Sequence, residues 1–157
     1  MTHPLRTAGL GLATLAAIAL TVLPGREARS DDARAAEKPS PVEGAWKQVE
    51  QKNGDAQDSV KPPEGTEMVI CITGGRFVWT VVQGGKVVAL AGGKYKVDKD
   101  TYSEIIEFVY GDGVPESFVG STFAFTAKVD GDTWHKVGTI KVGGQDYKID
   151  ETWRRCK

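Results

Sequence analysis

The clearest pattern in the sequence lies at residues 133–155, which read TWHKVGTIKVGGQDYKIDETWRR. Two runs of alternating side chains, 133–141 and 145–155, flank the pair Gly143-Gly144. Side chains two residues apart share one face of a β-strand, and a glycine pair supplies the positive φ angles of a two-residue hairpin turn. The stretch therefore predicts a β-hairpin. The side chains that share the apolar face of its second strand are Tyr147, Ile149, Glu151, Trp153 and Arg155.

Alternating runs separated by turn signals extend back to residue 44. Further glycine pairs stand at 74–75, 84–85 and 92–93, and tight turns are expected at 98–100 and 130–132. These boundaries predict strands at 44–51, 66–73, 76–82, 86–97, 101–110, 118–129, 133–141 and 145–155. The pair Gly92-Gly93 falls inside a strand and predicts a bulge or a sharp bend.

Eight sequential antiparallel strands with short connections predict an all-β fold, a closed up-and-down barrel without exposed sheet edges. The interior of such a barrel is just wide enough for side chains or one small ligand. A two-sheet sandwich is the alternative, although its crossing connections are normally longer than these hairpins.

Residues 1–30 have the layout of a secretory signal peptide. Arg6 precedes an apolar run from Ala8 to Leu23, and Ala28 and Ser30 place small residues before a cleavage site. The run is shorter than the ~20 residues of a membrane-spanning helix, which favours cleavage over an uncleaved anchor. We therefore expect a signal peptide at 1–30, a flexible leader at 31–41 and a barrel domain at 42–157. The protein would be exported, either to the periplasm or as a secreted protein, with no membrane span after cleavage.

Composition excludes several classes of site. The formal net charge is −1 and no run of Lys or Arg is present, so the chain lacks the electrostatic footprint of a nucleic-acid-binding protein. His135, Cys71 and Cys156 do not have the spacing of metal ligands, and we expect no metal and no cofactor. Export would permit a disulfide between the two cysteines, whereas the strand expected between them favours two free thiols. Both alternatives stay open.

Two carboxylates fall on apolar strand faces. Glu104 shares a face with Tyr102 and Ile106, and Glu151 shares one with Trp153. An unpaired buried charge is costly, so each needs a partner, for which Lys136 and Arg155 are candidates. In a structural interpretation a carboxylate pairs with an Arg or with backbone groups at one end of the barrel and fixes the register of the closing strand. In a functional interpretation they orient a polar group of a ligand in an aromatic cavity.

Several short motifs resemble those of the lipocalins and the wider calycin barrels. Gly44-Ala45-Trp46 resembles their Gly-x-Trp motif. Arg155, with Arg154 as the alternative, stands where those families place an Arg that packs across this Trp. The ordered motifs GGKY (92–95), YSE (102–104), GDTWH (131–135) and ETWRR (151–155) resemble bacterial exported lipocalin-like domains of unknown function. The resemblance covers about residues 42–155 and implies a barrel closed at one end by Trp46 and Arg155.

We expect a small exported binding protein that holds an apolar or amphipathic small molecule inside the barrel. The alternative is a filled-core structural or protein-interaction module that acts through loops 52–65 and 111–117 and its outer surface. No residue set calls for catalysis, and enzymatic activity is left open. The predicted cavity residues are Trp79, Tyr95, Tyr102, Glu104, Phe108, Phe123, Phe125, Trp134, Glu151 and Trp153.

Overall fold

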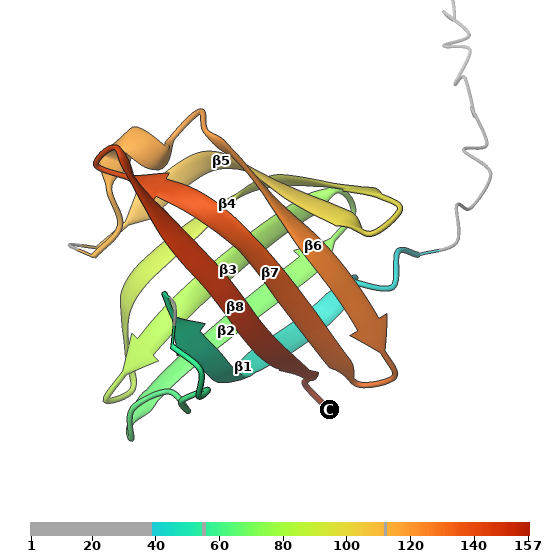
Figure 1. Ribbon diagram of the computed structural model, residues 1–157, viewed down its shortest axis with the longest axis horizontal. Coiled ribbons are helices and arrows are strands. Elements are labelled where there is room, and N and C mark those ends of the chain that lie inside the picture. The colour runs from blue at the N-terminus through green and yellow to red at the C-terminus, as the bar shows by residue number, and fades with distance from the viewer. Residues whose placement is uncertain (1–38, 55, 112) are drawn as a thin grey trace, which may run out of the picture. The chain divides into compact units, whose positions relative to one another are not determined.

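The computed structural model describes residues 39–54, 56–111 and 113–157. Antiparallel strands form one closed barrel in which each strand pairs with its neighbour in sequence and the last returns to the first (Figure 1). The elements are β1 (Gly44–Asn53), β2 (Thr66–Thr73), β3 (Arg76–Gln83), β4 (Lys86–Asp98), β5 (Thr101–Tyr110), the 3-10 helix η1 (Glu116–Phe118), β6 (Thr122–Asp130), β7 (Thr133–Val142) and β8 (Gln145–Arg155). The predicted eight-stranded up-and-down barrel is confirmed. The expected signal peptide and most of the expected leader lie outside the described residues.

The sixth strand begins later than the sequence pattern predicts. It starts at Thr122 rather than at residue 118 because the chain first forms η1 and a turn. Gly120 in this turn has a φ of +86°, a conformation that favours glycine. Its N–H donates to the carbonyl of Ile106, which holds the turn against β5.

A bulge in β5 reverses which side chains face inward at the end of that strand. Gly93 pairs with Ile106, whereas Gly92 pairs with Phe108, so β5 has one extra residue at this point. A Cβ atom at Gly93 would lie 2.0 Å from a backbone oxygen of β5, so only glycine permits this approach. The sequence-predicted bulge at Gly92-Gly93 is therefore confirmed.

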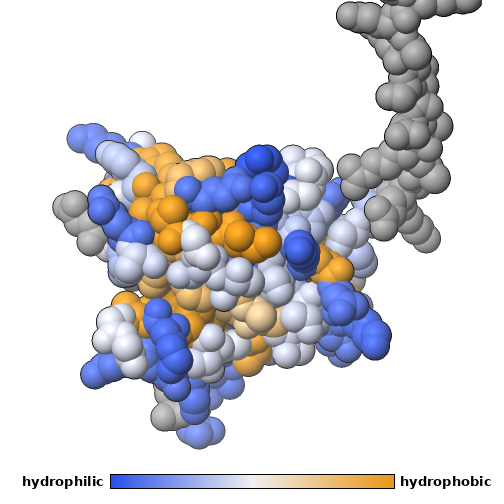
Figure 2. Space-filling model, turned by 90° about the horizontal axis from the view of Figure 1, so that it is seen from above, coloured by the Kyte–Doolittle hydropathy of each residue, from blue (hydrophilic) through white to orange (hydrophobic). Residues whose placement is uncertain are grey.

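The bulge places two predicted inward residues on the outer surface. Phe108 is 42% exposed and Tyr110 is 62% exposed. The prediction that Phe108 lines a cavity is wrong, because strict alternation does not count the extra residue of a bulge. The outer surface also carries groups of apolar side chains among polar ones, as the view from above shows (Figure 2).

One half of the barrel interior is filled by large aromatic side chains. Trp46, Trp134 and Trp153 are all buried. Trp134 packs edge-on against Trp46, with 5.7 Å between ring centres, and stacks on Trp153 at 5.9 Å. Aromatic pairs in these geometries contribute beyond the area they bury. The packing in this filled half joins the first strand to the last, since Trp46 lies on β1 and Trp153 on β8.

Arg155 covers Trp46 at the end of the filled half. Its guanidinium carbon lies 4.0 Å from the centre of the Trp46 ring. Its two terminal nitrogens donate to the carbonyl oxygens of Glu43 and Pro41 at 2.8 and 3.2 Å. A Cβ atom at Gly44 would lie 2.5 Å from the guanidinium, so this position has no room for a side chain. Arg155 thus ties the end of β8 to the residues that precede β1.

The two cysteines are free and exposed. Ala45 of β1 lies between them, because it pairs with Cys71 of β2 and its carbonyl accepts a hydrogen bond from the N–H of Cys156. The intervening strand keeps the two thiols apart. Of the two alternatives left open by the sequence, the structure has the free thiols and not the disulfide.

Candidate functional site

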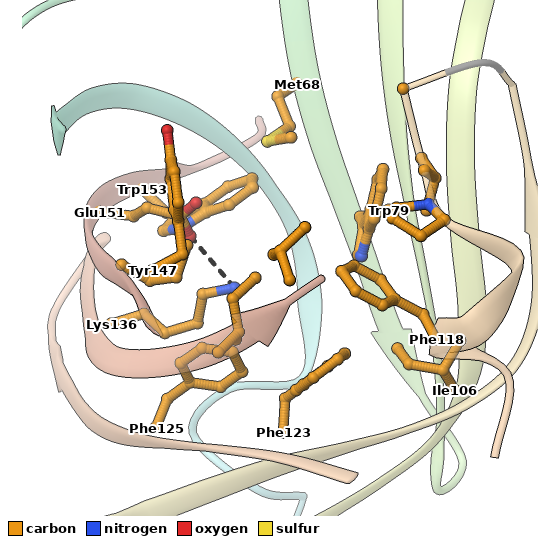
Figure 3. Close-up of a pocket in the computed structure, with 16 residues that line it drawn as sticks. Met68, Trp79, Ile106, Phe118, Phe123, Phe125, Lys136, Tyr147, Glu151 and Trp153 are labelled. Atoms are coloured by element: carbon orange, nitrogen blue, oxygen red, sulfur yellow. Dashed lines mark hydrogen bonds and ion pairs between the residues drawn. The ribbon is translucent and has the colours of Figure 1, made fainter. Parts of the chain in front are cut away.

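The other half of the barrel interior is hollow. A cavity of about 430 Å³ lies at the end of the barrel opposite Arg155. Of its described lining residues, only Lys136 and Glu151 are charged, and the others are mainly aliphatic or aromatic (Figure 3). The aromatic lining residues are Trp79, Phe118, Phe123, Phe125, Tyr147 and Trp153.

The mouth of the cavity is bordered by the connection between β5 and β6. Val114, Pro115 and Phe118 of this connection contribute to the lining. The ring of Phe118 packs edge-on against Phe123, with 5.0 Å between ring centres. Tyr147, near the start of β8, also lines the cavity and is 53% exposed, so it lies near solvent. We call residues 113–121 the mouth loop.

The floor of the cavity carries a buried group of three charged side chains. Lys136 on β7 lies opposite Glu151 on β8 in the sheet register, and its Nζ atom is 3.1 Å from Glu151 Oε2 (Figure 3). The same Nζ is 3.5 Å from Oε1 of Glu104, which comes from β5. The side chains of Glu104, Lys136 and Glu151 are only 4%, 7% and 13% exposed. We call these three residues the ionic cluster.

Aromatic rings surround the ammonium of the ionic cluster. Lys136 Nζ lies 4.5 Å from the ring centre of Phe125 and 5.5 Å from that of Trp153. The indole N–H of Trp153 donates to Glu151 Oε2 at 3.2 Å. One oxygen of Glu151 therefore forms an ion pair with Lys136 and accepts a hydrogen bond from Trp153. Among the described residues, no group donates to its other oxygen, Oε1.

Burial and charge shift the proton affinities of this cluster. Burial raises the pKa of the Glu104 carboxyl, Lys136 opposes this rise, and the neighbouring Glu151 adds to it. Burial alone would lower the pKa of Lys136, but the two carboxylates outweigh it and raise that pKa above its usual value. Burial, together with the Glu104 carboxylate, also raises the pKa of Tyr102. The environment therefore keeps Lys136 charged and favours a proton on Glu104.

The structure separates the predicted cavity residues into three groups. Those that line the cavity are Trp79, Phe123, Phe125, Glu151 and Trp153. Those that face inward or are buried but do not line it are Tyr95, Tyr102, Glu104 and Trp134. Phe108 alone lies on the outer surface.

The second group of predicted residues has contacts of its own. Tyr102 packs edge-on against Trp134, with 5.2 Å between ring centres, and lies beside Tyr95 at 5.9 Å. The hydroxyl of Tyr95 donates to Glu43 at 2.6 Å, toward the closed end. These side chains fill the barrel rather than line its cavity.

Sequence reasoning missed several lining residues. Met68 and Ile106 lie on strands, and Phe118 lies on the mouth loop, where strand alternation gives no signal. Lys136 was expected to partner a buried carboxylate but was not assigned to the cavity. Alternation identifies the face of a strand on which a side chain lies, and it does not identify which half of the barrel stays hollow.

The outer surface near β7 and β8 carries the histidine considered above. His135 Nε2 lies 2.8 Å from Asp150 Oδ1, and the His135 side chain is 48% exposed. Its outward orientation agrees with strand alternation. Among the described residues, no group of three or more His, Cys, Asp or Glu side chains is arranged to hold a metal ion.

No helix within the described residues is both long enough and apolar enough to cross a membrane.

Comparison with known proteins identifies the fold. No family model matches the sequence, and no curated protein has significant sequence similarity to it. The structure is similar to a lipocalin-like protein from Bacteroides uniformis, with a TM-score of 0.50 and 15% identity over 74% of this chain and 100% of that chain. A weaker match is an uncharacterized protein from Bacteroides eggerthii, with a TM-score of 0.46 and 15% identity over 69% of this chain and 98% of that chain. The chain has a lipocalin-like barrel fold.

Proposed function

We propose that the protein binds an apolar or amphipathic small molecule in the hollow half of its barrel. The observation that carries this proposal is the cavity of about 430 Å³, whose walls are mostly apolar and whose floor holds one charged pair. Small-molecule sites in proteins are typically concave, largely apolar and about 300–1,000 Å³ in volume, with a few polar groups that fix orientation. The charged pair, Lys136 and Glu151, would orient the polar end of such a ligand.

The contrast between the two halves of the barrel supports binding over the filled-core alternative. Around Trp46 and Trp134 the interior is packed, and both side chains have no exposed surface. Packing of this kind throughout the interior would have supplied more dispersion contacts and more buried apolar area. The chain instead leaves apolar walls uncovered at one end, where a ligand would gain by leaving water.

We also propose that the protein is exported and acts in the periplasm or outside the cell. The basic residue, apolar run and small residues within 1–30 support this proposal. The test is to express the full chain with its native start and determine the amino-terminal residue of the purified protein. A mature chain that begins near Asp31 and is recovered outside the cytoplasm is expected, and an intact cytoplasmic chain would contradict export.

Native mass spectrometry tests the binding function. The protein is purified without detergent and measured in native and denatured form. An extra mass that disappears on denaturation is expected, and it would give the ligand's identity. A matched pair of variants locates the site: Ile140→Trp fills the cavity from β7, whereas Thr139→Trp places the same bulk on the outer face. The extra mass should be lost only in Ile140→Trp.

A fluorescent neutral ligand, N-phenyl-1-naphthylamine, gives a second readout that does not depend on a co-purified molecule. Saturable binding to the wild type and to Thr139→Trp, but not to Ile140→Trp, is expected. A bare native mass together with no saturable binding of this compound would contradict the proposed function.

A further inference from the structure

The floor of the cavity holds more acid than base. Glu104 and Glu151 both contact Lys136, so two carboxylates share one ammonium. No other described residue that lines the cavity is charged. When both carboxylates are ionised, the ionic cluster has one negative charge in excess, and while Glu104 keeps the proton that its burial favours, the cluster is neutral. In neither state does the cluster offer an anionic ligand an unpaired positive charge. A cationic ligand would balance the charge that Glu104 gains on losing its proton, whereas an anionic ligand would add a negative charge in a site of low dielectric constant.

The polar atom that remains available for a ligand on the floor of the cavity is a hydrogen-bond acceptor. Glu151 lines the cavity, and its Oε2 atom already forms an ion pair with Lys136 and accepts a hydrogen bond from the Trp153 indole. Its Oε1 atom has no donor among the described residues. The Lys136 ammonium, in contrast, is already engaged by two carboxylates and by the Phe125 ring. An incoming carboxylate would therefore compete with these partners for the ammonium, whereas an incoming N–H group would meet an acceptor that has no donor.

The walls of the cavity also suit a cation. Aromatic faces attract ammonium groups, and this attraction strengthens when the group is removed from water. Lys136 already shows this at the floor, with its ammonium 4.5 Å from the ring centre of Phe125. Across the cavity, Trp79 and Phe118 present apolar surface to the body of a ligand (Figure 3).

We propose that the cavity selects apolar amines, whose charged N–H group donates to Oε1 of Glu151, over alcohols and carboxylates with the same apolar body. The inference rests on the proposed function, because it names the class of ligand for the same cavity. It excludes fatty acids as the preferred ligands, although the cavity contains a lysine.

The test uses three ligands with one body and different head groups: 4-phenylbutylamine, 4-phenylbutan-1-ol and 4-phenylbutanoate. Binding to the full-length protein at pH 7.5 is measured by calorimetry and by tryptophan fluorescence, since Trp79 and Trp153 both line the cavity. A hydrogen bond to a charged group is worth more than a neutral one, so the amine should bind about tenfold tighter than the alcohol. The carboxylate should bind about tenfold weaker than the alcohol, because its charge is repelled and desolvated.

Two variants assign the selectivity to one side chain. Glu151→Gln keeps an acceptor for Trp153 but removes the charge, so the amine should lose most of its tenfold advantage while the affinity for the alcohol stays within about threefold. Glu67→Gln removes an exposed carboxylate on β2, which pairs with Lys47, and should leave the affinities of all three ligands unchanged. The ranking of the three ligands on the wild type tests the inference even if Glu151→Gln does not fold.

The outcomes separate this inference from the proposed function. Equal affinities for the three ligands, or tightest binding of the carboxylate, would overturn the inference and leave the proposed function standing. Binding of N-phenyl-1-naphthylamine without binding of the amine would also overturn the inference alone. Failure of all four compounds to bind, together with a bare native mass, would overturn both.

Discussion

Replacing Glu104 with Gln should remove a cost of folding that grows with pH. Burial raises the pKa of this carboxyl in the folded protein above the usual value of 4.5 that it regains on unfolding. Between these two values the folded state holds a proton that the unfolded state has released. The stability contributed by this proton is full below the unfolded pKa and is lost as the pH rises through the folded pKa.

The linkage relation gives the size of the effect. One proton held only by the folded state lowers the free energy of unfolding by about 1.4 kcal/mol for each pH unit within the window. Gln has the shape of a protonated Glu and does not titrate. The free energy of unfolding of the Glu104→Gln variant therefore lacks this dependence on pH. The difference in free energy of unfolding, Glu104→Gln minus wild type, should therefore rise by about 1.4 kcal/mol per pH unit above pH 4.5, and level off at the folded pKa.

The assay is urea unfolding followed by tryptophan fluorescence at several pH values between 4 and 8. Glu107→Gln on the same strand is the control. Hydrogen bonds from Lys94 and Arg76 lower the pKa of Glu107, so its contribution is present above the usual Glu pKa and is lost only as the pH falls below it. The difference in free energy of unfolding between Glu107→Gln and wild type should therefore not change with pH above pH 5. A flat difference for Glu104→Gln as well would refute the assignment of a proton to Glu104.

Three further substitutions test other parts of the fold. Arg155→Ala removes the contact with Trp46 and two charged hydrogen bonds, so we expect the free energy of unfolding in urea to fall by about 2–4 kcal/mol. A fall of less than about 0.5 kcal/mol would contradict the role of Arg155 in closing this end of the barrel. Gly93→Ala should destabilise the barrel by several kcal/mol through a backbone clash, whereas Gly113→Ala, which meets no atom within 4 Å, should stay within about 0.5 kcal/mol. Phe118→Ala should speed the dissociation of N-phenyl-1-naphthylamine in stopped-flow measurements by opening the mouth loop, and an unchanged rate would show that this loop does not limit escape.

Strand pairing explains how much of this site the sequence could predict. A two-residue turn at Gly143-Gly144 is enough to place Lys136 opposite Glu151, and the structure has this register. The contact between Glu104 and Lys136 is different, because it joins β5 to β7 and no hairpin turn fixes it. A local pattern therefore predicts a pair within a hairpin, whereas contacts beyond adjacent strands depend on how the whole barrel closes.

The prediction that Phe108 lines the cavity failed for a related reason, because a local pattern does not reveal a change of register between strands. Alternation is reliable from Thr101 to Ile106, where one residue on β5 faces one on β4. The bulge next to Gly93 adds a residue, and every side chain after it changes face. The glycine pair indicates where a bulge lies, but it does not indicate which of the two paired strands carries the extra residue.

We interpret the ionic cluster as part of the proposed ligand selection rather than as a source of stability. Buried ion pairs contribute little net stability, because desolvation of the charges offsets their attraction, and apolar replacements of a whole cluster are often neutral or stabilising. We therefore expect Lys136→Met alone to destabilise the protein by about 3–5 kcal/mol, since it leaves two buried carboxylates without a cation. The triple variant Glu104→Leu, Lys136→Met, Glu151→Leu should recover most of this loss in urea unfolding. It should still bind 4-phenylbutan-1-ol, but it should no longer prefer 4-phenylbutylamine. A triple variant that is no more stable than Lys136→Met would show instead that the barrel needs these charges in order to fold.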